Sequence, residues 1–513
     1  MPSKVYSGAL IGIECERVEV ECDAGSGQFC FIIVGLPDMA VQESRERIRA
    51  ALKNSGLPFP RGRVTVNLAP ADVRKEGPAY DLPIALSILC ADGEIVASFS
   101  DQGRVFAETS LFAGELSLDG DVRPVRGILP LALLAKQLGI DTLFVAEENA
   151  DEASLTECLS VYGIRSLREL IEFFQGKREL ACHQRSDEVH KESEKEHIDF
   201  SHIRGQEHAK RALEIAAAGA HNILFSGPPG SGKTLLARSL QSILPQLTLN
   251  ESLEVTAIHS AAGLLSRQQP FVNSRPFRSP HHTASTASLV GGGSIPRPGE
   301  MSLAHRGVLF MDEFPEFSRS SLEALRQPLE DGHVTVSRSS GTVRFPAQCM
   351  LVAAQNPCPC GNYGKETTQC TCTASAIAHY QKKVSGPLMD RIDLFVDVPR
   401  VSYDHLSASS YSEQSSVVRE RVAQARSIQK QRFASNTYTT NAEMRSIDID
   451  RWCTLENDAR NLLGKAVGQL SLSARSYYRI LKIARTIADL EGSSCVALSH
   501  VAESLQYRHK PLI

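Results

Sequence analysis

Long apolar runs are missing from this 513-residue chain. We find no apolar run of about 18 residues or more, the length that a helix needs to cross a bilayer. Near the N-terminus, Glu14 and Glu16 interrupt the sequence before the apolar core of a signal peptide is complete. We therefore expect a cytoplasmic protein without membrane contact.

A strong excess of one charge is also missing, because 55 Lys and Arg stand against 59 Asp and Glu, for a net charge of −4. Proteins that bind duplex DNA on an exposed surface usually carry a basic footprint, which this composition does not indicate. A ring with a basic pore inside an acidic exterior would escape that argument. The 35 glycines and 25 prolines are ordinary usage and exclude collagen-like or low-complexity chains.

A charged segment, residues 176–200, divides the chain and holds 12 Asp, Glu, Lys and Arg among 25 residues. With few large apolar side chains it predicts a linker, and a solvated surface helix is the alternative. The parts on either side, 1–175 and 201–513, are each long enough to bury a core.

Short apolar runs in the second part predict the strands of a parallel sheet covered by helices on both faces, hence an α/β domain over 201–405. Beyond it, apolar positions at three- and four-residue steps predict a helical domain over 406–513, with helices at 415–433 and 473–492. The four strand-like runs are 223–225, 307–311, 349–354 and 392–396.

The segment GPPGSGKT fits the phosphate-loop pattern G-x-x-x-x-G-K-[ST] in full, between an apolar run and a helical pattern. Its glycines allow backbone N–H groups to point at phosphates, its lysine adds a positive charge, and its threonine offers a hydroxyl to Mg²⁺. We predict an ATP site formed by Gly227, Pro228, Pro229, Gly230, Ser231, Gly232, Lys233 and Thr234.

Two acids, Asp312 and Glu313, end the apolar run 307–311, about eighty residues after the phosphate loop. A carboxylate at the end of a neighbouring strand is suited to holding Mg²⁺, which is the role we expect for Asp312 together with Thr234. Glu313 is then placed to orient and deprotonate the attacking water.

The phosphate loop, the Asp-Glu pair and the terminal helices resemble an AAA+ ATPase. More closely, GQEHAKRALEIAAAGAHNILFSGPPGSGKT, FRSPHHTAS, LVGGGSIPRPGEMSLAHRGVLFMDEFPEF and AAQNPCPCG resemble the magnesium-chelatase-like family of competence proteins. The resemblance implies an AAA+ P-loop α/β domain with a C-terminal helical lid, assembled as a homo-hexamer. It assigns Asn356 to a sensor that helps place the water, Arg391 to an arginine finger and Arg475 to a second sensor on the lid.

Residues 1–175 resemble the proteolytic domain of Lon, an α+β fold, in KEGPAYDLPIALSIL and GELSLDGDVRPVRG. Lon requires a serine directly after its Gly-Pro and a lysine to activate it. Here Ala79 stands at the serine position, and residues 128–131 contain no lysine; Lys75 and Lys136 match neither position. We expect a scaffold without protease activity.

Two insertions are candidates for contact with DNA. Residues 333–345 alternate apolar and polar residues around Ser339-Ser340-Gly341, which predicts a hairpin carrying Arg338 and Arg344. The glycine-rich insertion at 288–300 carries Arg297. In helicases of this AAA+ branch, hairpins at these positions line the pore; packing between subunits is the alternative. For the pair His281 and His282, a helix-start or packing role is favoured over metal ligation.

Thirteen cysteines in a cytoplasmic chain do not indicate disulfides. Nine are scattered, and we interpret them as small apolar residues. The other four form the pattern C-x-C–x9–C-x-C, where four nearby thiolates would hold a structural Zn²⁺ and free thiols are the alternative. These four are Cys358, Cys360, Cys370 and Cys372.

The resulting hypothesis is a hexameric ATPase that moves single-stranded or branched DNA through its pore and promotes branch migration in natural transformation, with a recombinase as an expected partner. The alternative is a magnesium-chelatase-type or protein-remodelling ATPase. Ala79 and the absent lysine argue against an ATP-dependent protease.

Overall fold

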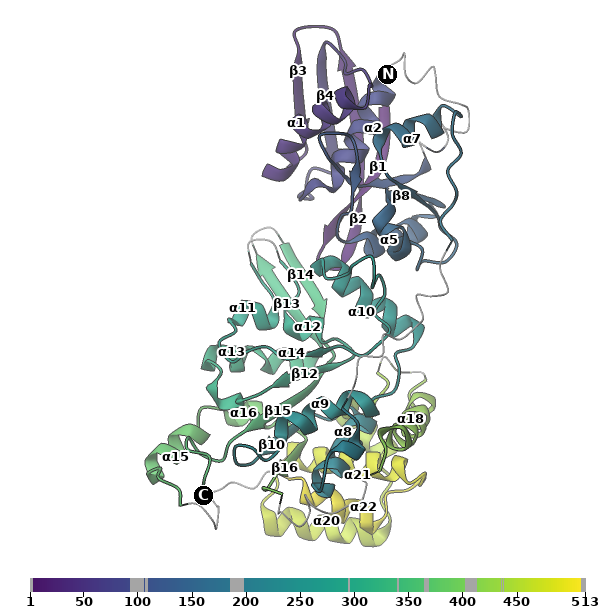
Figure 1. The fold of residues 1–513 in the computed structure, drawn as a ribbon. Helices are drawn as coiled ribbons and strands as arrows, with labels where there is room; N and C mark the ends of the chain where they lie inside the picture. Colours follow the sequence, from purple (N-terminus) through teal and green to yellow (C-terminus); the bar gives the residue numbers. More distant parts are fainter. Residues whose placement is uncertain are drawn as a thin grey trace.

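The computed structural model describes residues 3–92, 106, 109–184, 198–293, 296–338, 341–363, 369–401, 413–434, 436 and 438–508. Figure 1 shows an N-terminal domain at the top, the phosphate-loop domain below it, and the C-terminal helices packed at the base. Most of the predicted charged linker, residues 185–197, lies outside the described residues.

The N-terminal domain is built on a mixed seven-stranded sheet of order β3-β4-β2-β1-β5-β8-β9. Strand β1 alternates buried and partly exposed side chains, as expected for a strand with one face on the core. The strands are β1 Ser3–Ile11, β2 Glu14–Gly25, β3 Cys30–Val34, β4 Arg63–Ala69, β5 Leu111–Ala113, β8 Thr142–Ala146 and β9 Ser160–Ile164, with a small ribbon of β6 Glu115–Leu116 and β7 Val122–Arg123. The helices are α1 Met39–Asn54, η1 Pro78–Tyr80, α2 Asp81–Ala91, α5 Ile128–Leu138, η2 Glu147–Asn149, α6 Ala150–Ala153 and α7 Leu167–Phe174.

The second domain contains a five-stranded parallel sheet of order β11-β12-β15-β10-β16. Four of its strands confirm the four predicted runs: β10 Ile223–Ser226, β12 Val308–Met311, β15 Met350–Gln355 and β16 Leu394–Asp397. The edge strand β11 Phe277–Arg278 was not predicted, because two residues are too short to show a pattern. An antiparallel hairpin, β13 His333–Arg338 and β14 Gly341–Pro346, stands apart from the sheet.

The helices of this domain include α8 Glu207–Gly219, α9 Lys233–Ile243 and α10 Leu249–Ala262. Shorter ones are η4 Phe200–His202, α11 Thr286–Val290, α12 Glu300–Leu303, η5 Phe314–Glu316, α13 Arg319–Ala324, α14 Arg326–Asp331, α15 Ala374–Gln381 and α16 Gly386–Met389. Side chains of β10, β12 and β15 alternate between two buried clusters, so both faces of the sheet are covered.

The C-terminal region is helical in its described residues, as predicted. Helices α18 and α21 pack against α8, so the region is attached to the phosphate-loop domain through a shared core. Its elements are α18 Ser415–Arg432, η6 Asn441–Glu443, α19 Ser446–Trp452, α20 Asn457–Leu470, α21 Ala474–Leu490 and α22 Leu498–Gln506.

The N-terminal domain contacts the second domain mainly through α5 and α10 (Figure 1). The Ser260 hydroxyl donates to the buried Glu152 carboxylate at 2.5 Å, and the Gly127 N–H donates to the Ser260 carbonyl at 3.3 Å. Leu129 and Phe271 belong to one small apolar cluster across this boundary. In the described part of the chain, every helix is too short or too polar to cross a membrane.

Candidate active site

The phosphate loop, residues 227–232, connects the end of β10 to the start of α9. Gly232 has φ 89°, a left-handed conformation that favours glycine. Because α9 begins at Lys233, its first N–H groups have no helical carbonyl partner and face the loop, where the helix dipole favours an anion.

Lys233 folds over this loop. Its Nζ donates to the Gly227 carbonyl at 2.7 Å, to the Pro228 carbonyl at 3.0 Å and to Asn356 Oδ1 at 3.2 Å. Ser231 Oγ is buried and has no hydrogen-bond partner among the described residues. The start of a helix, a buried hydroxyl and one amine held by replaceable carbonyl contacts together fit the phosphates of ATP.

The oxygen ligands suited to Mg²⁺ lie beside the loop. Thr234 Oγ1 donates to Asp312 Oδ2 at 2.8 Å, which joins the start of α9 to the end of β12. A hydroxyl and a carboxylate are the hard oxygen ligands that Mg²⁺ prefers. Lys233, Thr234, Asp312 and Asn356 are thus brought together by the carboxyl ends of three adjacent parallel strands.

Glu313 follows directly, with φ 51° and with its side chain 55% exposed. Its N–H donates to Asp312 Oδ1 at 2.9 Å. One turn therefore positions both the candidate magnesium ligand and the candidate base. An exposed carboxylate next to the phosphate loop is available to a water molecule, as proton abstraction requires.

His282 is a site residue that sequence reasoning missed. Its Nδ1 lies 3.2 Å from Glu313 Oε2, and its ring packs against that of His281 at a centroid distance of 4.1 Å. Both histidines follow β11, the strand that was not predicted, and β11 pairs with β12, which ends at the Asp-Glu pair. The signal in the sequence was two adjacent polar rings, but their partner depends on this pairing.

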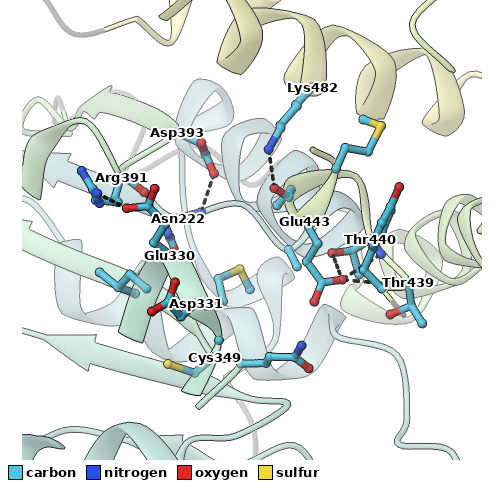
Figure 2. A pocket seen from close by; sticks show the side chains of 18 of the residues that line it. Asn222, Glu330, Asp331, Cys349, Arg391, Asp393, Thr439, Thr440, Glu443 and Lys482 are labelled. Atoms are coloured by element: carbon cyan, nitrogen blue, oxygen red, sulfur yellow. Dashed lines mark hydrogen bonds and ion pairs between the residues drawn. The ribbon is translucent and has the colours of Figure 1, made fainter. Parts of the chain in front are cut away.

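Arg391 and Arg475 lie at the opposite ends of the parallel strands, the amino ends, where the strands begin. They line a cavity of about 830 Å³ together with Asn222 and Asp393, the residues before β10 and β16 (Figure 2). No residue of the phosphate loop lines this cavity. Asn222 and Gly227 flank β10 and are five residues apart, or about 16 Å along an extended strand. The structure therefore does not bring these two arginines to the Lys233 of their own chain.

Arg391 is held in place by contacts within its own chain. It forms an ion pair with Glu330 (Figure 2), and its Nη1 donates to the Pro387 carbonyl at 2.8 Å. Its Nε is buried and has no partner among the described residues, and 15% of the side chain is exposed.

Arg475 projects from α21 toward the same cavity. Its Nη1 lies 3.7 Å from Asp390 Oδ2, and Arg479 Nη2 donates to the Asp390 carbonyl at 2.6 Å. Burial raises the pKa of Asp393, but a hydrogen bond from His221 and the nearby arginine and lysine charges outweigh it and leave that pKa below its usual range. The lid is thus fixed to the segment 390–393 by charged contacts.

Three family models match consecutive parts of the chain. They are subunit ChlI of Mg-chelatase over residues 18–149, magnesium chelatase subunit ChlI over 199–406, and the magnesium chelatase subunit ChlI C-terminal model over 412–508. Competence protein ComM of Haemophilus influenzae is 44% identical over 98% of this chain and 97% of its own length. The chain belongs to the magnesium-chelatase-like AAA+ family that includes ComM.

Other relatives differ in how much of the chain they cover. The uncharacterized protein YifB of Escherichia coli is 40% identical over 99% of this chain and 97% of its own length. The magnesium-chelatase 38 kDa subunit of Cereibacter sphaeroides is 27% identical over 32% of this chain and 54% of its own length. Family membership makes this chain an AAA+ ATPase, for which ATP and Mg²⁺ are the expected ligands of the site described above.

The AAA+ domain carries the predicted hairpin as β13 and β14, with Arg338 opposite Gly341. Ser339, Ser340 and the side chain of Arg338 lie outside the described residues. Arg344 is exposed, and its Nη2 donates to His333 Nδ1 at 3.0 Å. One side of the hairpin packs on the N-terminal domain, since a Cβ on Gly12 would clash with the side chain of Val343.

Arg297, the third residue predicted to contact DNA, lies between the two domains. With Pro296 and Pro298 it lines a cavity of about 310 Å³ that also contains Ala79 and Arg126 of the N-terminal domain. Burial lowers the pKa of Arg126, and the charge of Arg297 lowers it further, which indicates that the two guanidinium groups lie near each other.

Ala79, the residue expected at the position of Lon's serine, lines the same cavity. Ala79 offers no hydroxyl, and the described lining includes the apolar Ile128 and Leu131 but no lysine. Lys75 is buried and its Nζ donates to the Pro70 carbonyl, while Lys136 is exposed on α5. The described lining therefore lacks the serine and the lysine that Lon requires, although it includes the thiol of Cys15.

The four clustered cysteines converge in the AAA+ domain directly after Asn356. Their sulfur atoms all lie within 4.8 Å of one another, and three of the pairs are 3.4, 3.6 and 3.8 Å apart. A tetrahedral zinc site with Zn–S bonds of about 2.3 Å has S–S edges of about 3.8 Å. The Tyr363 N–H donates to Cys358 Sγ at 3.3 Å.

Proposed function

We propose that this ATPase assembles as a homo-hexameric ring in the cytoplasm and uses ATP hydrolysis to move along single-stranded or branched DNA, promoting branch migration when imported strands recombine during natural transformation. The observation that carries the ring is the separation of Arg391 and Arg475 from the phosphate loop of their own chain. In-line phosphoryl transfer needs cations around the transferred group, so a neighbouring copy has to supply them.

DNA is the proposed substrate because the hairpin carries arginines at its tip and on its returning strand, at Arg338 and Arg344. Arginine on a hairpin suits tracking of a phosphate backbone without base readout. The name of the Haemophilus relative, competence protein, supports a role in transformation. A recombinase that pairs the strands is a further proposed partner.

Within the ring, each chain contributes two sets of residues to catalysis. Lys233 and the start of α9 bind the phosphates, Thr234 and Asp312 hold Mg²⁺, and Glu313 takes a proton from water. When bound, Mg²⁺ supplies charge neutralisation at the phosphate oxygens. The neighbouring chain contributes Arg391 and Arg475, and Arg391 has to exchange Glu330 for a phosphate oxygen.

We also propose that Cys358, Cys360, Cys370 and Cys372 hold one structural Zn²⁺. The sulfur spacing is close to the edge of a tetrahedral ZnS₄ site, and soft thiolate ligands select Zn²⁺ over Mg²⁺. The N-terminal domain is proposed to act as a scaffold of the ring without protease activity, because its cleft presents Ala79 where a serine would be required.

The test is the processing of a labelled synthetic four-way junction by the purified protein with ATP and Mg²⁺. We expect strand exchange by the wild type, none by Glu313→Gln, and strong loss in the double variant Arg338→Ala, Arg344→Ala. Arg123→Ala is the matched control, because Arg123 is an exposed arginine on β7 of the N-terminal domain. An ATPase rate that no DNA changes, together with an unprocessed junction, would overturn the DNA proposal in favour of a protein or tetrapyrrole substrate.

A further inference from the structure

The four-cysteine cluster touches the phosphate loop. Gly361, which lies between Cys360 and the second cysteine pair, has φ 74°, and a Cβ there would clash with the ring of Pro229. Its N–H donates to the Cys358 carbonyl at 2.9 Å, which closes a tight turn around the first pair. The turn that holds two of the thiolates therefore lies in van der Waals contact with the loop that holds the phosphates.

The cluster also joins the end of β15 to the start of α15. The first pair follows Asn356, whose Oδ1 accepts a hydrogen bond from Lys233, and Cys372 is followed by Thr373, the residue that caps α15. Near the other end of that helix, Gln381 Nε2 lies 3.5 Å from the Pro357 carbonyl and donates to it. The segment between Asn356 and α15 is thus anchored at both ends, and thiolate–metal bonds would fix its middle.

We propose that Zn²⁺ bound to these four thiolates supports the phosphate loop, so that nucleotide affinity depends on zinc occupancy. The inference rests on the proposed zinc site and is independent of the proposed DNA motor. With the metal bound, Gly361 presses on Pro229 and Asn356 is held against Lys233. Without it, four thiols separate, the turn around Gly361 loosens and the loop loses this contact.

Gly361→Ala tests the contact without removing a ligand. We expect it to keep one zinc per chain, measured by elemental analysis, and to weaken binding of a fluorescent ADP analogue by tenfold or more. Gly492→Ala is the matched control, because Gly492 has nearly the same φ of 70° but nothing lies within 4 Å of an added Cβ. We expect the control to change neither zinc content nor affinity.

A second experiment removes the metal from the wild type. After treatment with a zinc chelator and its removal, we expect about tenfold weaker nucleotide binding in excess Mg²⁺, and recovery when Zn²⁺ is added back. Cys360→Ser with Cys372→Ser is expected to behave like the zinc-free protein, and Cys495→Ser, outside the cluster, like the wild type. Full zinc content with unchanged affinity in Gly361→Ala would overturn the coupling alone. Fresh protein with much less than one zinc per chain would overturn the zinc site and the coupling together.

Discussion

The two ends of the parallel strands in the AAA+ domain carry different functional groups. The carboxyl ends of the strands hold one amine, a carboxylate suited to Mg²⁺ and a candidate base, at Lys233, Asp312 and Glu313. At the amino ends of the strands, arginines face a wide cavity, Arg391 and Arg475 among them. The two ends of the strands thus offer different groups, and hydrolysis needs both a bound phosphate chain and cations around the transferred group. For the proposed ring, the comparison teaches that one chain holds one half of each of two sites.

Mixing two inactive variants gives the largest expected effect. Lys233→Ala removes the amine that binds the phosphates, and Arg391→Ala removes the proposed arginine finger. Each variant alone should lose ATPase activity by about 10³-fold or more. An equimolar mixture should recover a substantial part of that activity, because some interfaces then combine an intact loop with an intact finger. A mixture as inactive as its components would show that the halves do not complete each other.

Glu313→Gln should lower hydrolysis by about 10²- to 10⁴-fold, because the amide cannot accept a proton from water. Binding of the fluorescent ADP analogue should stay within about twofold of the wild type, since the phosphates are held by Lys233 and α9. Steady-state ATPase and binding titrations measure the two effects separately. Normal turnover in this variant would remove Glu313 from the role of base.

Arg475→Ala should lower the ATPase rate by about a hundredfold at most, as expected for the loss of one of several charges around the transferred group. Its side chain is 59% exposed, so the stability of the fold should be unaffected. Arg460→Ala, an exposed arginine on α20 of the same lid, is the control. Equal rates for the two variants would mean that Arg475 is only a surface residue.

His282→Asn should have the smallest effect. A pair with an exposed carboxylate is worth about 1 kcal/mol or less, so the DNA-free ATPase rate should change by no more than about fivefold. We expect a rise, because Glu313 is released toward water, and no change in His281→Asn, whose ring nitrogen contacts Thr283 instead. A fall in rate would show that His282 orients Glu313 productively.

Much of the fold could be predicted because its signals are local. Strands β10, β12, β15 and β16 are continuous apolar runs, which fully buried parallel strands require, and the lid helices show a regular apolar period. Strand β11 has two residues and carries no such signal, although it sets the position of His282.

The positions of the arginines could not be predicted from local sequence patterns. The sequence identified Arg391 and Arg475 by resemblance to the family. Whether they lie at the amino or the carboxyl ends of the strands depends on where α16 and α21 pack. Likewise, the sequence offered Arg297 as a candidate for DNA contact, but its place in one cavity with Ala79 and Arg126 follows from the docking of two domains. Long-range packing decided both.

By itself, the sequence determined the local chemistry: the loop geometry at Gly232, the candidate ligands Thr234 and Asp312, the candidate base Glu313 and the four thiols of the cluster. These depend on residue type and on a few neighbouring dihedral angles. Only the tertiary structure decided that the arginines face away from their own phosphate loop, that His282 meets Glu313, and that Gly361 rests on Pro229. The physical reason is that such contacts join residues distant in the chain, and their geometry is set by the packing of the whole sheet and its helices.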